Sequence, residues 1–507
     1  MELSKHICTQ LQEKSQSFSQ ITLDDDFIVR DNKPDVIRVI YSRGEVYVED
    51  VRAGNQSVWI SGKLRFSTLY QSDDENHRLE SVNGEVPFQE KLFMDEVEEN
   101  DDIIVDMTIE DLSVGIINSR KLAIRAVLNA TARNLEETEE ELSCSIPHFG
   151  YEQKTTSAPI LCLIENTKEH LRMQKELVLP NSRSNIGQIT FYQVDFRNEE
   201  FILHDDTVQV KMDAQIWVLY RSESTGEYEC YESTLPLTGE IDVSPLRGDE
   251  IFWAKIKPLE TDLEPRGDYD GENRMLGLDL IFSVELQIYR EENCQILQDA
   301  YALDKELLLE RKALPINQLL MKNVSKIRLL EQEQLELNQQ RILQICGSSG
   351  NVTIDRIQKR ENGLQVEGVL NVHLLYNTTD DAMPFAHTST QIPFDQFIEI
   401  EDFSETSIYW IKESVEQLQV NLLESSEYEI KALIQIAALV LKQNYISNIV
   451  AIEEEDLSLD TLQKQPGMIG YVRREGEDLW DVAKKYHAST DNMIEIGDKI
   501  LIIKQVI

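Results

Sequence analysis

Histidine and cysteine are the residue types that could bind a metal or act as nucleophiles, and this chain spaces them widely. The eight histidines, at positions 6, 77, 148, 170, 204, 373, 387 and 487, form no HxH or HxxxH pair. The six cysteines stand singly, with no CxxC pair. Because zinc and redox sites usually draw ligands from such short-range pairs, we expect no metal site and no cofactor. His373 lies in a strand-like run and is interpreted as an ordinary sheet residue.

Carboxylates give no clearer sign of catalysis. With 92 acidic residues, paired carboxylates occur throughout the chain, so pairing does not identify a catalytic site. Residues 268–273, DYDGEN, resemble a calcium loop but lack its third acid and its bidentate glutamate. No Walker-type glycine loop is present to hold phosphates. The sequence therefore predicts a protein that is not an enzyme.

Composition and the N-terminus indicate the class of protein. The 507 residues are 41% hydrophobic, enough for several domains with apolar cores. A net charge of −43 repels phosphate backbones and anionic lipid, so we expect no nucleic-acid partner. The first 18 residues contain no apolar core like that of a secretory signal, and the longest apolar run, residues 432–441, is half the length of a membrane-spanning helix. We expect a cytoplasmic chain without a membrane span, in which thiols stay reduced. Its cysteines are then expected to be free and mostly buried: Cys8, Cys144, Cys162, Cys230, Cys294 and Cys346.

The elements that would position any site follow an internal repeat. Three segments alternate apolar and polar residues, end in Leu-Tyr, cross a polar turn and close on a proline. Their tyrosines, Tyr70, Tyr220 and Tyr376, are 150 and 156 residues apart. Each proline follows its tyrosine by 16 or 17 residues, at Pro87, Pro236 and Pro393. Equal spacing at two landmarks predicts three copies of one domain.

Within each copy the hydrophobic period is two, which predicts β-strands. Each copy also has a later alternating run, at residues 120–133, 276–290 and 426–442. Several such strands with few helices indicate an antiparallel sandwich or a partly open barrel, and periodicity does not separate these. The connecting segments 156–178 and 303–337 are charged and Leu-rich and could be short helices or strands.

The C-terminal 40 residues have a different pattern. A short strand at Tyr471 leads to a turn at Gly476, and Asp478 can cap a helix with Asp481 in its first turn. Leu479, Val482, Ala483 and Tyr486 would form one apolar stripe on that helix. Gly497 and Asp498 then turn into a final strand. The expected order is strand, helix, short helical turn, strand. For Trp480 and Tyr486 we favour packing in the core over contact with a ligand.

Together these patterns predict a mainly β chain of tandem repeats with a small α+β (βααβ) domain at its end. The expected parts are an N-terminal segment (1–18), three repeats (19–150, 151–310 and 311–450), an acidic linker (451–467) and a terminal domain (468–507).

The terminal domain resembles a LysM domain. The match lies in its opening (Tyr471, Gly476, Leu479, Trp480, Val482, Ala483 and Tyr486) and its closing run (Gly497, Asp498, Lys499, Ile500 and Ile502). The family's second helix and following loop form one wall of its glycan cleft, whereas here residues 494–496 run straight into Gly497. The shortened wall implies a protein ligand rather than a sugar. The predicted partner-binding residues are Arg473, Arg474, Glu475, Gly476, Glu477, Asp478 and Trp480.

The repeats resemble the SPOCS domain. Repeat 1 has the family's K-P-D at Lys33, Pro34 and Asp35, and the runs VYVEDV (46–51) and VTIDRI (352–357) match its V-x-I-x-D strand. Repeats 2 and 3 lack K-P-D, so its role is expected in repeat 1 alone. SPOCS repeats followed by LysM are similar to the clostridial spore coat morphogenetic proteins of the SipL type.

That resemblance implies a non-enzymatic protein of spore coat assembly in the mother-cell cytoplasm, at the forespore surface. It also implies that the LysM domain docks on a coat-basement ATPase of the SpoIVA type. The alternative is an accessory protein of the cell wall or spore cortex that binds peptidoglycan or a chitin-type glycan.

Overall fold

The structure, a computed structural model, describes residues 2–74, 78–336, 339–380, 382–457, 466–474 and 476–503. Antiparallel strands dominate it, which confirms the expectation of a mainly β chain. The two segments left open as helix or strand are strands, β7 (Tyr151–Val178) and β13 (Lys305–Gln334). Among the helices of the described residues, none is long and apolar enough to cross a membrane.

The first part of the chain, unit 1, consists of six strands in two three-stranded sheets. The sheets have the orders β1-β6-β5 and β2-β3-β4, with every pair antiparallel. Both contribute side chains to one apolar core, so the unit is a sandwich. Its strands are β1 (Ser4–Ile28), β2 (Val36–Gly54), β3 (Ser57–Ser72), β4 (Leu79–Phe93), β5 (Ile103–Asn118) and β6 (Lys121–Ser145).

Two further parts of the chain, units 2 and 3, pair their strands in the same order, each around its own core. Unit 2 contains β7, β8 (Ile186–Leu203), β9 (Thr207–Ser222), β10 (Tyr228–Asp242), β11 (Ile251–Gly267) and β12 (Asn273–Ala302). Unit 3 contains β13, β14 (Ile342–Arg360), β15 (Gly363–Thr378), β16 (Phe385–Glu399), β17 (Ser407–Glu424) and β18 (Glu427–Asp456). The observed strand bounds differ from the expected borders: residues 4–18 are part of β1, and β18 continues past 450 to Asp456.

Alternation of apolar and polar residues determines which side chains of the central strands point into the core. In β3 the side chains of Ile60, Leu64 and Phe66 all point into the core and are at most 2% exposed. The repeat tyrosines lie at the end of this buried face, Tyr70 in β3 and Tyr220 in the corresponding strand β9. Tyr70 and Tyr220 are fully buried, and their hydroxyls donate to backbone carbonyls of their own units, at 3.1 and 3.3 Å.

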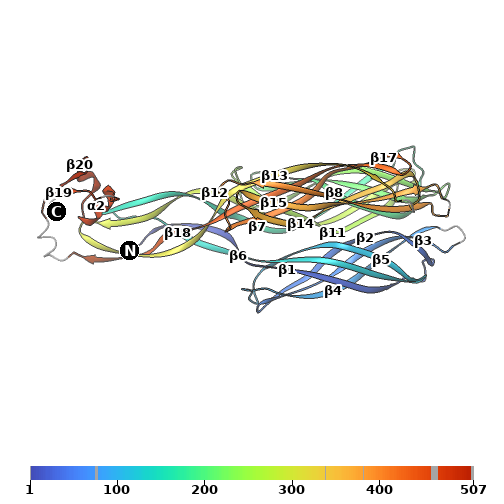
Figure 1. The fold of residues 1–507 in the computed structure, drawn as a ribbon, viewed down its shortest axis with the longest axis horizontal. Helices are drawn as coiled ribbons and strands as arrows, with labels where there is room; N and C mark the ends of the chain where they lie inside the picture. The colour runs from blue at the N-terminus through green and yellow to red at the C-terminus, as the bar shows by residue number, and fades with distance from the viewer. Residues whose placement is uncertain are drawn as a thin grey trace.

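Three long strand pairs extend beyond the sandwiches and form a stalk. The ends of β1 and β6, β7 and β12, and β13 and β18 run together toward the C-terminal module (Figure 1). Their inward side chains form clusters drawn from all three units, one of which contains Cys8, Leu142, Ile160, Cys162, Cys294, Ile296, Leu314 and Ile316. Buried side-chain amides form hydrogen bonds between the strand pairs of the stalk. Asn317 donates its backbone N–H to the Gln10 side chain at 2.9 Å, and Asn448 accepts from the Ser143 N–H at 2.9 Å.

A second shared cluster, the central cluster, joins the three sandwiches. It comprises Tyr41, Leu69, Leu79, Phe191, Trp217, Leu219, Cys346, Leu375 and Phe385, three from each unit. The Tyr41 hydroxyl lies 3.1 Å from Gln193 of unit 2 and 3.4 Å from Ser349 of unit 3. The units are therefore packed into one body through side chains that no single unit could bury.

The prediction that all six cysteines are free is wrong for two of them. Cys8 of β1 and Cys162 of β7 form a disulfide, with their Cα atoms 5.4 Å apart. The two residues are 154 positions apart in the chain, and only the crossing of the two stalk strands brings them together. Cys144, Cys230, Cys294 and Cys346 are free.

The C-terminal module (described residues 466–474 and 476–503) has one helix, one 3-10 turn and one small sheet. Its elements are β19 (Met468–Val472), α2 (Leu479–Lys485), η1 (Thr490–Asn492), β20 (Met493–Ile496) and β21 (Lys499–Ile503). The sheet order is β19-β21-β20, so a third short strand, β20, follows the helical turn. One face of the sheet packs on α2 through Val482, Ala488, Ile500 and Ile502.

Candidate functional site

The predicted partner-binding loop precedes α2, and its local structure follows from three residues. Gly476 has a φ of 87°, a left-handed conformation that favours glycine. Asp478 caps the helix by accepting the Asp481 N–H at 2.8 Å, and Asp481 reciprocates as a capping box. Glu477 accepts both the Tyr471 hydroxyl (2.7 Å) and the Arg474 N–H (3.0 Å), which holds the loop against β19. Glu475 lies outside the described residues.

Trp480, predicted in the module's core, instead faces the stalk. Its indole N–H donates to Asp299 Oδ2 of β12 at 2.8 Å, and its ring meets Tyr301 edge-on, with centroids 4.9 Å apart. Lys484, one helical turn further on, donates to Asp299 Oδ1 at 2.6 Å. Of the two aromatics predicted to be buried, Tyr486 does pack within the module's apolar cluster.

Further contacts extend this docking of α2 on the stalk. Asp478 pairs with Lys154 of β7 at 2.8 Å, and the Tyr301 hydroxyl donates to the Ala488 carbonyl at 2.8 Å. His487 lies 3.0 Å from the Ala302 carbonyl and 3.3 Å from Glu306. Two of the predicted partner-binding residues, Asp478 and Trp480, are thus occupied by this chain itself.

Electrostatics favour this contact. Burial alone would raise the pKa of the Asp299 carboxyl, but hydrogen bonds from Lys484 and Trp480, together with the charge of Lys484, lower it below its usual range. Asp299 and Tyr301 were not identified from the sequence. They are about 180 positions from α2, and one acid among 92 carries no signal of its own.

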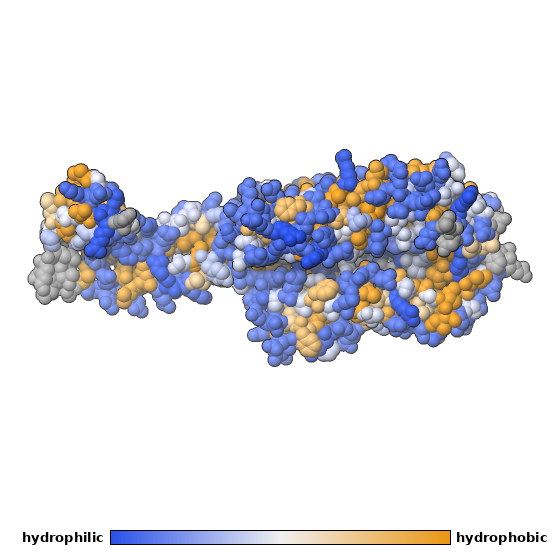
Figure 2. Space-filling view, in the orientation of Figure 1, coloured by the Kyte–Doolittle hydropathy of each residue, from blue (hydrophilic) through white to orange (hydrophobic). Residues whose placement is uncertain are grey.

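The other face of the sheet is an accessible apolar surface of the module. Alternate residues of the three strands point away from α2 and remain exposed although apolar: Met468, Val472, Ile494, Ile496 and Ile503. We call these five residues the apolar sheet face. Ile496, on β20, is 74% exposed, and Figure 2 shows apolar residues gathered over β20 at the tip of the module. Arg473 at its border pairs with Glu495 at 2.7 Å, while Arg474 is exposed.

The K-P-D motif of unit 1 is a structural connection between β1 and β2. Lys33 pairs with Glu80 at 2.7 Å, and Pro34 supplies the carbonyl that the buried Tyr70 hydroxyl uses. Asp35 accepts from the Ser119 hydroxyl at 2.7 Å and from Arg120 at 3.2 Å. Arg120 also donates to the Lys33 carbonyl at 2.6 Å. These side chains close the connection, and each polar group has a partner inside the unit.

Unit 2 builds a similar connection without the motif. Arg274 occupies the place of Arg120 and donates to Asn185 and to the Pro180 carbonyl, both at 2.9 Å. Arg183 lies 3.9 Å from Glu229, which also accepts the Tyr220 hydroxyl. Unit 2 thus makes a comparable connection with different residues, and a role of K-P-D in repeat 1 alone stays a prediction.

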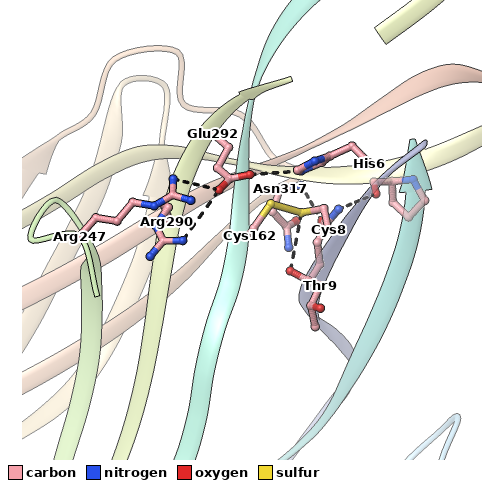
Figure 3. Close-up of a disulfide and its surroundings, with 10 residues drawn as sticks. His6, Cys8, Thr9, Cys162, Arg247, Arg290, Glu292 and Asn317 are labelled. Carbon is pink, nitrogen blue, oxygen red and sulfur yellow. Dashed lines mark hydrogen bonds and ion pairs between the residues drawn. A yellow bond between two sulfur atoms is a disulfide. The ribbon is translucent and has the colours of Figure 1, made fainter. Parts of the chain in front are cut away.

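One group of side chains in the described residues could hold a metal ion. His6, Cys162 and Glu292 place a nitrogen, a sulfur and a carboxylate oxygen within 4.8 Å of one another, and the sulfur is one of the two in the Cys8–Cys162 disulfide (Figure 3). They come from three different strands and are far apart in the sequence, which is why spacing rules do not find them.

Comparison with known proteins identifies two segments. A protein-family model described as "SipL, SPOCS domain" matches residues 35–117 and 341–423. The first match runs from the start of β2 into β5, and the second from the start of β14 into β17. These two segments of the chain are therefore similar to the SPOCS domain. This family suggests a sporulation-related function. No curated protein and no solved structure matches the chain.

Proposed function

We propose that this chain is a non-enzymatic assembly protein of the spore envelope, made of three SPOCS domains and a terminal LysM domain. In this proposal it acts in the mother-cell cytoplasm at the forespore surface, where the C-terminal module docks on a coat-basement ATPase of the SpoIVA type. The observation that carries the proposal is the pair of SPOCS matches in a chain whose terminal module keeps an apolar sheet face exposed.

Unit 2 supports the reading of three SPOCS domains although the family model matches only units 1 and 3. Its strand order is that of the other two units, and its buried Tyr220 corresponds to Tyr70 and Tyr376. Arg274 reproduces the connection that Arg120 makes in unit 1. We therefore assign unit 2 to the same domain type.

The apolar sheet face supports a protein ligand for the module. Exposed apolar residues that lie together on a small domain are typical of protein-binding surfaces. The helix face is covered by the stalk, so the sheet face and the Arg474 loop are what the module can offer a partner. Arg474 and Lys499 add positive charge to an otherwise acidic chain and could orient an acidic partner.

Capture experiments with the full-length chain test this proposal. We expect it to retain the purified coat ATPase and not peptidoglycan. Ile496→Glu and Arg474→Glu should each weaken retention, by about tenfold or more for Ile496→Glu because a charge would be desolvated in the contact. Arg474 is preferred to Arg473 because reversing Arg473 would also break its pair with Glu495.

Leu330→Glu is the matched control, because Leu330 is an exposed apolar residue of β13 in unit 3. This variant should bind as the unchanged chain does. Retention on peptidoglycan with none on the ATPase would overturn the proposal in favour of glycan binding. Unchanged ATPase capture by folded Ile496→Glu would exclude the apolar sheet face as the contact.

A further inference from the structure

Four potential zinc ligands meet where the stalk strands of units 1 and 2 cross. His6 and Cys8 are two positions apart on β1, so their side chains share one face of that strand. Cys162 of β7 lies opposite Arg290 of β12, and Glu292 is two positions further along the same face. Figure 3 shows His6, Glu292 and the two sulfur atoms converging on one place between the strands.

The distances suit one small ion. His6 Nε2 lies 3.2 Å from Glu292 Oε2, and a ring nitrogen of His6, a carboxylate oxygen of Glu292 and the Cys162 sulfur all lie within 4.8 Å of one another. A tetrahedral zinc ion with bonds of about 2.0 to 2.3 Å holds its ligand atoms about 3.3 to 3.8 Å apart. Small side-chain movements would bring nitrogen, oxygen and Cys162 sulfur into that range. The Cys8 sulfur, bonded to that of Cys162, becomes a ligand once the disulfide opens.

The surroundings of Glu292 and His6 resemble the outer shell of a metal site. Arg247 and Arg290 approach Glu292 Oε1 at 3.7 and 3.9 Å, which leaves Oε2 for the ion. Arg290 is itself held by the buried Glu250. The His6 Nε2 atom is buried and, among the described residues, makes no hydrogen bond of good geometry. Two thiolates, one carboxylate and Zn²⁺ sum to a charge of −1, and adding Arg247, Arg290 and the Glu250 carboxylate brings the sum to zero.

We propose that His6, Cys8, Cys162 and Glu292 form a Zn²⁺ site that replaces the disulfide when the chain is reduced. A dithiol reductant gives two electrons to the Cys8–Cys162 bond and leaves as its own disulfide, and each cysteine sulfur takes up one proton. Zinc binding then releases these two protons and joins both thiolates to one ion. Units 1 and 2 are linked in both states, by a covalent bond in one and by the metal in the other. His6 and Glu292 keep side chains 36% and 23% exposed, which gives the ion a way in.

Metal content of the full-length chain tests the proposal. We expect about one equivalent of Zn²⁺ per chain after reduction under argon, and less than about a tenth of that for the oxidised chain. Co²⁺ in place of Zn²⁺ should give the intense thiolate charge-transfer absorption and the visible bands of a tetrahedral site. Glu292→Gln and His6→Ala should weaken Zn²⁺ binding at least about tenfold in competition with a chromophoric chelator.

Two variants serve as matched controls. Cys346→Ser removes a buried thiol of unit 3, and His170→Ala removes an exposed histidine of β7, so both should bind zinc as the unchanged chain does. Glu292→Gln and His6→Ala retain both cysteines, and peptide mapping of the oxidised variants shows whether the disulfide, and hence the fold, still forms. The proposal is overturned if the reduced chain retains no zinc. It is equally overturned if folded Glu292→Gln or His6→Ala binds zinc unchanged, because that would mark adventitious binding by surface carboxylates.

Discussion

At the scale of single residues, docking of the C-terminal module depends most on Asp299. Its carboxylate accepts from both Trp480 and Lys484, so Asp299→Asn removes a charge-assisted bond and should weaken docking by roughly 1 to 3 kcal/mol. Hydrogen exchange of the α2 amides should become faster while that of the sandwiches stays unchanged. Asp279→Asn is the control, since Asp279 is an acid of the same strand whose partners, Arg172 and Gln174, lie away from the module. Equal exchange of α2 in both variants would contradict this role.

The docking contact should also depend on pH, with a sign that the pKa shift determines. Because the pKa of Asp299 is lowered on folding, its carboxylate stabilises docking above the ordinary range of about pH 4. That contribution is lost as the pH falls through the lowered pKa of Asp299.

The sequence predicted the cap at Asp478 and the apolar stripe of α2, since both are local patterns. The sequence did not predict the position of Trp480, because its partners Asp299 and Tyr301 come close to it only after the stalk has formed.

At the scale of elements, Gly62 shows how close packing inside one unit constrains a strand. A Cβ at this position of β3 would meet the Tyr47 carbonyl oxygen across the ladder and the Phe88 ring at 2.8 Å. Gly62→Ala should therefore lower the free energy of unfolding by about 1 to 3 kcal/mol, measured in denaturant. Gly115→Ala in β5 is the control, because no atom lies within 4 Å of its added Cβ, and it should be neutral. Similar midpoints for both variants would show that β2 and β4 can move aside.

Strands were the elements most readily predicted, since alternation of buried and exposed residues is imposed by the pleat itself. The long strands were identified only in part. The run predicted at 120–133 is the half of β6 inside the sandwich, and the strand continues to Ser145 in the stalk. There its partners come from other units and the alternation is interrupted by polar residues such as Ser143, which bonds across to unit 3. The family model likewise matches parts of the sandwiches and not the stalk.

At the scale of the whole molecule, the shared clusters should make the three units unfold together. Trp217 of unit 2 stacks on Phe191 and lies against Gly347 of unit 3, where any larger side chain would collide with its ring. Trp217→Ala leaves a cavity between units and should cost about 3 to 5 kcal/mol. If the central cluster couples the units, calorimetry should show one transition at a lower temperature. Hydrogen exchange should then accelerate equally in core peptides of all three units.

Trp59→Ala is the control for Trp217→Ala, because it removes a tryptophan that lies outside the central cluster. Trp59 is 42% exposed on β3 and contacts Lys91 within its own unit, so its removal should leave the transition nearly unchanged. Independent units would behave differently, because Trp217→Ala would then accelerate exchange in unit 2 and leave units 1 and 3 protected. Such an outcome would mean that each sandwich is stabilised by its own core and does not depend on the central cluster. A single shared transition would instead show that the three units unfold as one cooperative body, joined by the central cluster.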